Sequence, residues 1–519
     1  MNIPFILEKA LSLFGDREAV VCGEARFTYK EFADRVYRLA NFLRSSGVGQ
    51  GDCIAILHQN SHEFLETYFA TAQVGAILNP LNYRLSPNEL AFILRDSGAS
   101  LLIASDRFVQ SVEPLLEMEI DLNQVLWTGS VVRASAPFES MYYEEVLREE
   151  KAVAPRLPDI SDDDVVHLYY TSGTTGRPKG VMLSHKNVCV HALAAVAELK
   201  LGDHDNWIHV APLFHLADAW ATFAITWVGG KHVVVPDFDP PLVLSAIEQE
   251  RVTISNMIPT MLNMLVNTPG VETHDFSSLR AILSGGAPIA PEVVRKIMGV
   301  FKCDYIQTYG MTETSPYLTV SILKENLARL SEEEQFVYKA KTGRPFMGVL
   351  LKVVREDGTE VIANDEEVGE IVVKGDIVTK GYWNRPEETA KALKDGWLYT
   401  GDMAVVDKEG YVNIVDRKKD MIITGGENVY SVEVENVLYT HPSVLEAAVI
   451  GVADPKWGEA VKAVLVLKAG ETATEEEIIQ YCKEHIARYK APKSVDFISE
   501  LPKTGSGKIF KKGLKERYG

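Results

Sequence analysis

Residues 169–185 read YYTSGTTGRPKGVMLSH, and this short segment concentrates hydroxyl, glycine and basic residues. Its hydroxyls come from Thr171, Ser172, Thr174 and Thr175, its first glycines are Gly173 and Gly176, and its cations are Arg177 and Lys179. Glycine lets a backbone approach phosphate oxygens closely, while hydroxyls and cations bind those oxygens or a bound Mg²⁺. The segment therefore predicts a polyphosphate-binding loop, to which a flexible surface turn is the plain alternative.

This loop differs from a Walker A motif, in which Gly-Lys-Ser/Thr runs directly into a helix. Here Arg177 and Pro178 separate Gly176 from Lys179, and Gly180 follows. The string TSGTTGRPKG resembles the signature of the adenylate-forming superfamily, which contains acyl- and aryl-CoA synthetases, adenylation domains of nonribosomal peptide synthetases, and luciferases. The resemblance implies that ATP activates a carboxylate as an acyl-AMP, whose acyl group then passes to a thiol or to oxygen.

The bulk composition agrees with a soluble enzyme of several domains. A chain of 519 residues is too long for one compact core, so two or more domains are expected. Apolar residues make up 46% of the chain, which is typical of a globular enzyme. The formal net charge of −19 argues against nucleic acid as the main partner, because binding to a phosphate backbone needs a basic surface.

The cysteines and the termini bear on the compartment. The five cysteines are far apart and odd in number, which predicts reduced thiols in a cytoplasmic setting and neither a disulfide framework nor a zinc site. They are Cys22, Cys53, Cys189, Cys303 and Cys482. Glu8 and Lys9 interrupt the N-terminal segment, so no signal peptide is expected. No run of about 18 apolar residues predicts a transmembrane segment, and the terminal KERYG is no peroxisomal address.

Hydrophobic periodicity predicts a large multi-layer α/β domain with mixed sheets, followed by a small α+β domain. Helices are expected at 29–45, 63–72, 242–250 and 291–301, and strands at 53–57, 101–104, 207–210, 232–235, 350–354, 370–373 and 411–415. We place the boundary after Asp416, so that residues 1–416 form the large domain and residues 417–519 a small, mobile one. Ser431 is expected to cap the first helix of the small domain.

The segment QTYGMTET, Gln307 to Thr314, supplies an aromatic face, a glycine and a Thr-Glu pair. Such a segment can stack on a base and hold a metal, although taken alone it is better interpreted as an ordinary loop. It resembles the YGxTE element of the superfamily, which implies that Thr312 contacts the α-phosphate and Glu313 binds Mg²⁺, with Thr171 as the hydroxyl nearest the metal. The resemblance also assigns nucleotide contacts to Gln307, Thr308, Tyr309, Gly310, Gly286, Ala287 and Pro288.

Two further motifs complete the nucleotide site by resemblance. Asp402, in Tyr399-Thr400-Gly401-Asp402, resembles the ribose-binding aspartate, although a TGD string is often only a turn. In the charged run 416–420, Arg417 would reach the ribose or a phosphate and Lys419 would be the pivot between domains. A solvated linker is the alternative interpretation of that run.

Residues 502–508 read PKTGSGK and resemble the catalytic lysine loop of the superfamily. Its glycines leave the loop free to enter a site, and Lys508 would deliver a cation to oxygens on which negative charge develops. Lys179 and Thr312 would share that catalytic role. A basic C-terminal tail is the alternative, and it is compatible with attraction of ATP and CoA.

The acid pocket is assigned by two segments, PLFHLADAW at 212–220 and SGGAP at 284–288, which resemble walls of the acyl site. The acid-binding candidates are His215, Trp220, Gly285, Gly286, Gly310 and Met311. A purely structural role for His215 stays open. Acetate-specific relatives carry a tryptophan where Gly310 stands, so an open floor and a bulky or long acid are expected. Amino-acid-activating domains carry an aspartate where His215 stands, and the nearby Asp218 leaves that alternative open.

Together these features predict an ATP-dependent, AMP-forming acyl-CoA synthetase for a medium-chain, long-chain or aryl acid, using ATP, CoA and Mg²⁺. Its small domain would swing about Lys419 to present Gly425 and Gly426, while Lys456 and Trp457 would contact CoA. The partners are small molecules, and a homodimer stays open. The alternatives are a stand-alone enzyme that loads a carrier protein and a non-catalytic acyl or nucleotide sensor. Luciferase-like oxygenation is disfavoured because the paired histidine of those proteins is single here.

Overall fold

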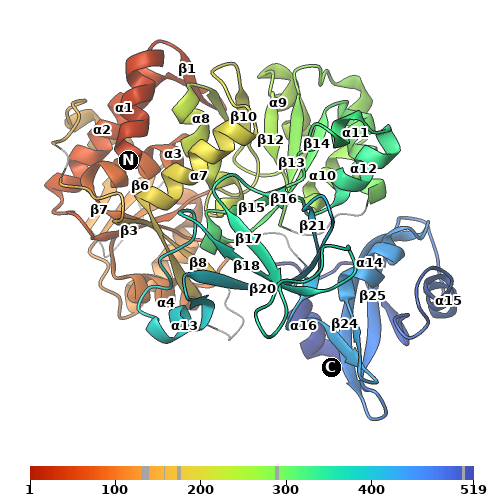
Figure 1. The fold of residues 1–519 in the computed structure, drawn as a ribbon. Helices are drawn as coiled ribbons and strands as arrows, with labels where there is room; N and C mark the ends of the chain where they lie inside the picture. Colours follow the sequence, from red (N-terminus) through yellow and green to blue (C-terminus); the bar gives the residue numbers. More distant parts are fainter. Residues whose placement is uncertain (130–138, 157, 172–176, 287–290, 505–508, 519) are drawn as a thin grey trace.

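The computed structural model describes residues 1–129, 139–156, 158–171, 177–286, 291–504 and 509–518. Within these ranges the strands form four sheets, of seven, nine, five and five strands. The first three sheets belong to the larger part of the molecule, and the fourth belongs to the C-terminal hundred residues, drawn in blue at the lower right of Figure 1.

The seven-stranded sheet holds the strand that leads into the predicted phosphate loop. Its order is β7 (Glu139–Tyr142), β6 (Gln124–Thr128), β5 (Ala99–Ser105), β3 (Cys53–Leu57), β4 (Ile77–Pro80), β8 (Val165–Thr171) and β9 (Lys179–Ser184). Neighbouring strands are parallel except for the antiparallel pair β8 and β9. The strand β3 is buried along its whole length, which is typical of parallel sheets covered on both faces.

The nine-stranded sheet supplies the second half of the site. Its order is β16 (Arg344–Pro345), β15 (Tyr317–Val320), β14 (Asp304–Gly310), β13 (Ala281–Ser284), β12 (Ile254–Asn256), β10 (Asn206–His209), β11 (Lys231–Val234), β1 (Glu18–Cys22) and β2 (Ala25–Thr28). The six strands from β14 to β1 are parallel to one another, whereas the edge pairs β14–β15 and β1–β2 are antiparallel. Ligands bind at the carboxyl ends of such strands, and the Gln307–Thr314 segment lies at that end of β14.

A layer of helices fills the space between the two large sheets. The helices are α1 (Ile3–Phe14), α2 (Tyr29–Ser45), α3 (His62–Val74), α7 (His185–Glu198) and α8 (Leu216–Val228). The largest hydrophobic core joins side chains of these helices to Ile54 of β3 and Ile254 of β12. Figure 1 shows α7 and α8 between the N-terminal and central parts of the fold. Further helices cover the outer faces, namely α4 (Pro87–Ser97) on the first sheet, and α9 (Pro240–Gln249), α10 (Pro259–Val266) and α11 (Pro291–Phe301) on the second.

Local sequence explains why α2 begins at Tyr29. The Thr28 hydroxyl accepts from the Glu31 N–H at 3.2 Å, and the Glu31 carboxylate accepts from the Thr28 N–H at 2.8 Å. Such reciprocal capping is worth about 1 kcal/mol. The prediction of a helix at 29–45 is confirmed residue for residue, as are the strand at 53–57 and the helix at 291–301.

The third sheet is antiparallel and links the large sheets to the small domain. It contains β17 (Leu350–Val354), β18 (Gly369–Lys374), β20 (Trp397–Val406), β19 (Leu393–Lys394) and β21 (Val412–Arg417). In its register Asp402 of β20 faces Arg417 of β21. Lys419 lies in the turn directly after β21, where the Asp420 N–H donates to the Arg417 carbonyl at 2.8 Å.

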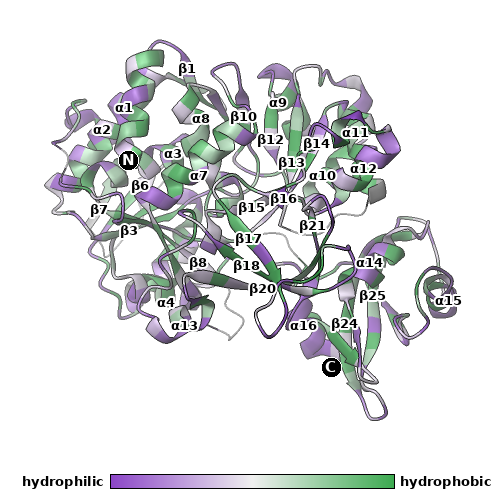
Figure 2. Cartoon of the chain, in the orientation of Figure 1, coloured by the Kyte–Doolittle hydropathy of each residue, from purple (hydrophilic) through white to green (hydrophobic). Residues whose placement is uncertain are grey.

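The fourth sheet forms the core of the small domain. It contains β23 (Glu427–Val429), β22 (Ile422–Thr424), β25 (Gly458–Leu467), β24 (Val444–Asp454) and β26 (Ser494–Phe497), and it packs against α14 (Ser431–Tyr439), α15 (Glu475–His485) and α16 (Lys511–Tyr518). Figure 2 shows hydrophobic colour along β24 and hydrophilic colour on α16. No helix in the described ranges has both the length and the apolar character needed to cross a membrane.

The predicted cap at Ser431 is wrong. Ser431 is the first helical residue of α14, and the preceding Tyr430 provides no side-chain cap. The Ser431 hydroxyl instead accepts from Lys511 at 2.6 Å, and its N–H donates to Asp416 at 2.5 Å. A tertiary contact has therefore taken the groups that a local cap would use.

Candidate active site

The hairpin of β8 and β9 brings Thr171 opposite Lys179 in the register of the sheet. The predicted loop residues Ser172, Gly173, Thr174, Thr175 and Gly176 lie outside the described residues. The ends of the hairpin are thus fixed by strand pairing, so that a hydroxyl and an ammonium group flank the loop that joins them.

Glu313 lies beside this hairpin, in the 3₁₀ turn Thr312–Thr314 that follows β14. Its carboxylate is 7% exposed and accepts a hydrogen bond from the Tyr382 hydroxyl at 2.9 Å. Burial raises the pKa of Glu313, and burial and this carboxylate also raise the pKa of Tyr382, so the tyrosine stays protonated as the donor. The Lys179 ammonium lies 5.2 Å from the centre of the Tyr382 ring, within range of a cation–π contact.

Asp402 forms a second group with Tyr309 and Arg417. The Tyr309 hydroxyl donates to Asp402 Oδ2 at 2.7 Å, and Arg417 Nε lies 3.1 Å from Asp402 Oδ1. Asp402 is 4% exposed and contacts a cation and a hydroxyl, while the Arg417 side chain that supplies the cation is itself exposed to solvent. Three residues that the sequence assigned to the nucleotide therefore contact one another, although their roles stay predictions.

The two groups belong to one electrostatic environment. Burial raises the pKa of Glu313, the negative charge of Asp402 adds to that rise, and the positive charge of Arg417 opposes it. Burial lowers the pKa of Arg417, but nearby acidic groups, Glu313 among them, raise it above its ordinary value. Thr308 fixes the neighbouring strand end, because its hydroxyl donates to the Ser284 carbonyl at 3.1 Å. A Cβ on Gly285 would meet that hydroxyl at 2.3 Å, so a glycine is required there. Ala287 and Pro288, which follow it, lie outside the described residues.

The acid-wall candidates on α8 are held by local hydrogen bonds. His215 directly precedes α8, and its Nδ1 accepts from the Ala217 N–H at 3.1 Å. His215 therefore has the structural role of capping this helix. Trp220 is buried, and its Nε1 donates to the Ala217 carbonyl at 3.0 Å. Its ring packs edge-on against Tyr317 with ring centres 5.1 Å apart. Gly286 is exposed and lies just after β13. Met311 is partly exposed and lies directly after β14.

The expectation that the missing side chain of Gly310 leaves an open pocket floor is wrong, because another backbone segment occupies that space. A Cβ at Gly310 would lie 1.9 Å from the Pro316 carbonyl oxygen, so the missing side chain permits close approach of two backbone segments. Gly310 can still present its backbone to a ligand.

The alternative that Asp218 binds a substrate ammonium is also not supported. Asp218 is fully buried and accepts from Trp207 Nε1 at 3.0 Å, and its other oxygen lies 2.9 Å from His209 Nδ1. Its hydrogen-bonding capacity is already engaged within the protein.

The residues predicted to contact CoA lie together at one end of the small-domain sheet. The Gly425 N–H donates to the Trp457 carbonyl at 2.8 Å, and a Cβ on Gly425 would meet the Trp457 ring at 2.8 Å. The Lys456 ammonium lies 4.6 Å from that ring centre, and Trp457 is 45% exposed. Gly426 follows with a left-handed φ of 84°. Lys508 lies outside the described residues.

The donor set fits a magnesium ion that is bound mainly through phosphates. The described residues contain no group of three or more His, Cys, Asp or Glu side chains that could hold a metal alone. Mg²⁺ in nucleotide sites typically takes one or two carboxylates and completes its shell with phosphate oxygens and water. Glu313, with one oxygen engaged by Tyr382, can supply such a carboxylate.

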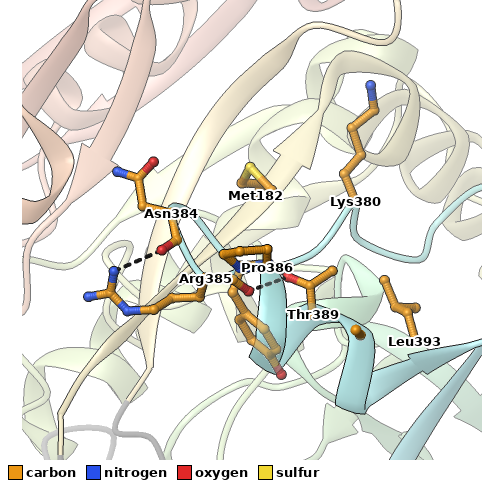
Figure 3. A pocket seen from close by; sticks show the side chains of 9 residues that line it. Met182, Lys380, Asn384, Arg385, Pro386, Thr389 and Leu393 are labelled. Atoms are coloured by element: carbon orange, nitrogen blue, oxygen red, sulfur yellow. Dashed lines mark hydrogen bonds between the residues drawn. The ribbon is translucent and has the colours of Figure 1, made fainter.

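Sequence reasoning missed Tyr382, which contacts Glu313 and Lys179. The signal available was Gly381-Tyr382-Trp383, two aromatic residues within a polar stretch, but that pattern has no defined chemistry. Tyr382 also lines a surface cavity of about 410 Å³, whose other walls are shown in Figure 3.

Comparison with known proteins gives matches along nearly the whole chain. A family model described as AMP-binding enzyme matches residues 7–383, and one described as AMP-binding enzyme C-terminal domain matches residues 433–508. A feruloyl-CoA synthase of an Amycolatopsis species is 41% identical over 502 residues, which cover 96% of each chain. A long-chain-fatty-acid–CoA ligase of Thermus thermophilus is 39% identical over 530 residues, which cover 100% of this chain and 96% of the ligase.

A solved structure extends the likeness to the fold. The anthranilate CoA ligase in complex with anthranoyl-AMP has a TM-score of 0.90 and 28% identity, and the match covers 100% of this chain and 97% of that one. The large domain with its smaller C-terminal domain thus matches enzymes with an acyl-adenylate in the site.

Proposed function

Since the chain belongs to the AMP-binding enzyme family and is an AMP-forming acyl-CoA synthetase, we propose that it activates a medium-chain, long-chain or aryl acid with MgATP. The observation that carries the proposal is the convergence of two groups, Asp402 with Tyr309 and Arg417, and Glu313 with Tyr382. The first suits the two ribose hydroxyls of a nucleotide, and the second suits a metal bound to its phosphates.

In the first half-reaction the substrate carboxylate attacks the α-phosphorus of ATP, and pyrophosphate leaves. Lys508, Thr312 and Lys179 stabilise the negative charge that develops on the phosphate oxygens. A bound Mg²⁺ supplies charge neutralisation on those oxygens when present. Asp402 accepts from the ribose hydroxyls, while Arg417 holds its carboxylate in place.

In the second half-reaction the CoA thiolate attacks the acyl carbonyl, and AMP leaves. The small domain turns at Lys419, which lies in the turn after β21, and brings Gly425 and Gly426 to the site. Close contact of Gly425 with Trp457 supports this assignment, because it joins the loop to an exposed indole and to the Lys456 ammonium. These two side chains contact the CoA nucleotide.

The acid is proposed to be larger than acetate. The two relatives described above are named for ferulate and for long-chain fatty acids, both of which carry a bulky apolar group. The wall beside α8 is aromatic, with Trp220 packed between Tyr317 and Trp207. We also assign the enzyme to the cytoplasm, because its five cysteines are free thiols.

Product analysis tests the function. The full chain is incubated with ATP, MgCl₂, CoA and one acid at a time from a panel that runs from acetate to palmitate and includes ferulate and benzoate. AMP, pyrophosphate and acyl-CoA should appear in equal amounts with a large acid. Pyrophosphate release with no thioester would favour an enzyme that loads a carrier protein, and ATP binding without turnover would favour a sensor. A highest kcat/KM for acetate would refute the proposed acid class.

A further inference from the structure

The contacts of Tyr382 reach two candidate groups of the site at once. Its hydroxyl donates to Glu313 at 2.9 Å, and its ring lies 5.2 Å from the Lys179 ammonium. Glu313 comes from the turn that follows β14 of one large sheet, and Lys179 is the first residue of β9 in the other. Tyr382 therefore bridges the two halves of the site.

Hydrogen bonds to neighbouring segments fix the backbone around Tyr382, although this residue lies in a loop. Tyr382 forms a bridge with Val181 of β9, and its N–H donates to the Thr389 hydroxyl at 3.0 Å. One residue away, the Gly381 carbonyl accepts from the Met182 N–H at 3.1 Å. The segment is thus an added edge to β9, so the tyrosine ring has a defined place against that strand.

The other polar groups near Tyr382 already have partners. In the cavity of Figure 3, Lys380 donates to the Asp163 carbonyl at 2.6 Å, and Arg385 lies 2.6 Å from the Asp96 carboxylate. These cations are engaged away from Glu313. The Tyr382 hydroxyl is the side-chain donor to Glu313 within the part of the chain that the structure describes.

From this geometry we propose that Tyr382 is a positioning residue for adenylation, which orients the Glu313 carboxylate toward MgATP and holds Lys179 over its ring. The proposal rests on the function proposed above. A hydrogen bond from a hydroxyl to one carboxylate oxygen fixes the orientation of the other oxygen. The carboxylate is then already oriented when the metal binds, and binding costs less conformational entropy. The Tyr382 ring likewise restricts the position of the Lys179 ammonium group, which is carried on a flexible side chain.

The first test separates the hydroxyl from the ring. Tyr382→Phe removes the hydrogen bond and keeps the ring. The Mn²⁺ concentration that half-saturates the enzyme should therefore rise about fivefold to tenfold. Electron paramagnetic resonance in the presence of a non-hydrolysable ATP analogue measures this concentration. The KM for the acid should not change. Tyr382→Leu should show the same loss and in addition a higher Kd for the ATP analogue without metal, because Lys179 loses its support.

The matched control is Tyr143→Phe. Tyr143 also donates to a buried carboxylate, Glu66, at 2.7 Å, but it packs in the core with α2, apart from the contacts that Tyr382 makes with Glu313 and Lys179. This variant should bind Mn²⁺ as the wild type does. Thioester formation from supplied acyl-AMP and CoA should stay near the wild-type rate in both Tyr382 variants, whereas a merely structural defect would lower both half-reactions.

Glu313→Gln separates failure of this inference from failure of the metal assignment. If Glu313→Gln weakens Mn²⁺ binding and Tyr382→Phe does not, Tyr382 is not the positioning residue. If neither variant changes Mn²⁺ binding while AMP and pyrophosphate still form, the metal lies elsewhere and the inference is also overturned. Weakened Mn²⁺ binding in both variants, with intact thioester formation, supports it.

Discussion

The Asp416 carboxylate accepts a hydrogen bond from the Ser431 N–H, with an N···Oδ2 distance of 2.5 Å. Asp416 belongs to the last strand of the third sheet and Ser431 opens the first helix of the small domain, so the contact spans the predicted pivot Lys419. Lys511 of α16 joins this contact by donating to the Ser431 hydroxyl and lies 2.7 Å from Glu435. A buried cluster of two carboxylates and one ammonium therefore flanks the predicted pivot.

Removing the shared cation should destabilise the small domain. In Lys511→Ala, the Glu435 carboxylate, which is 8% exposed, keeps only the Val449 N–H as a hydrogen-bond donor among the contacts described. Loss of one partner of a buried ion pair costs about 3–5 kcal/mol. Urea unfolding of the full chain, with hydrogen exchange at α14 to locate the change, measures this loss.

The control for that variant is Lys512→Ala on the same helix. Lys512 is exposed and lies 3.8 Å from the equally exposed Glu516. Its removal should change the free energy of unfolding by less than about 0.5 kcal/mol. Equal effects of the two substitutions would show that the buried cluster does not hold the domain.

Gly310→Ala should damage the fold of the site rather than shift its preference among acids. The added Cβ would lie 1.9 Å from the Pro316 carbonyl oxygen, so two backbone segments must separate. Overpacking of this kind costs about 1–3 kcal/mol. Thermal unfolding should occur at a lower temperature, and kcat/KM for a short and a long acid should fall by the same factor.

Gly299→Ala provides the comparison, because a Cβ there meets nothing within 4 Å and Gly299 lies in α11. Replacing this helical glycine should be neutral or stabilise by up to about 1 kcal/mol. A change in acid preference in Gly310→Ala at unchanged stability would restore the interpretation of Gly310 as a pocket floor.

The four helices and seven strands that the sequence predicts all correspond to elements of the structure, because apolar residues mark each of them locally. The helix at 29–45 has its cap, its capping partner and its apolar face within one segment, so local information is sufficient. The phosphate loop is predicted from its residue types, and the roles of Glu313 and Asp402 are predicted by resemblance, since their motifs are short and contiguous; these roles stay predictions. The structure adds that Asp402, Tyr309 and Arg417 are in contact.

What the sequence cannot predict depends on pairs of residues far apart in the chain. Tyr382 reaches Glu313 across 69 positions, and no local pattern marks it. Ser431 has the residue type of a helix cap, but its groups are taken by Asp416 and Lys511. At Gly310 the sequence shows only that a side chain is missing, and the backbone that fills its place is the Pro316 carbonyl, directly before the next strand.

Acidification should unfold the large domain through its buried histidines. Burial lowers the pKa of His185 to about 4, and its neutral Nδ1 accepts from the Ile3 N–H at 3.2 Å. The unfolded chain binds the proton at about pH 6.5, so stability is complete above that pH and is lost as the pH falls toward 4. This one group accounts for at most about 3 kcal/mol over that window.

His185→Gln keeps an acceptor for the Ile3 N–H and removes the loss of stability that protonation of His185 in the unfolded chain causes. Urea midpoints at pH 7.5 and pH 5.0 should therefore differ less in His185→Gln than in the wild type. His204→Gln, at an exposed position, is the control and should retain the wild-type difference. An unchanged difference in His185→Gln would mean that other groups cause the acid sensitivity.

Lys508→Ala gives the most direct test of domain alternation, because two half-reactions require Lys508 to different degrees. Removing one well-placed stabiliser of transition-state charge costs about 2.7–4 kcal/mol, or roughly 10²–10³ in rate, so adenylate formation from ATP should fall by that factor. Thioester formation from supplied acyl-AMP and CoA should stay near wild type, since the small domain has by then turned Lys508 away. Lys419→Pro should give the opposite pattern, because proline restricts φ at the pivot and impairs rotation while adenylation continues. Equal loss of both half-reactions in Lys508→Ala would argue against alternation and would favour a basic tail that only attracts the substrates.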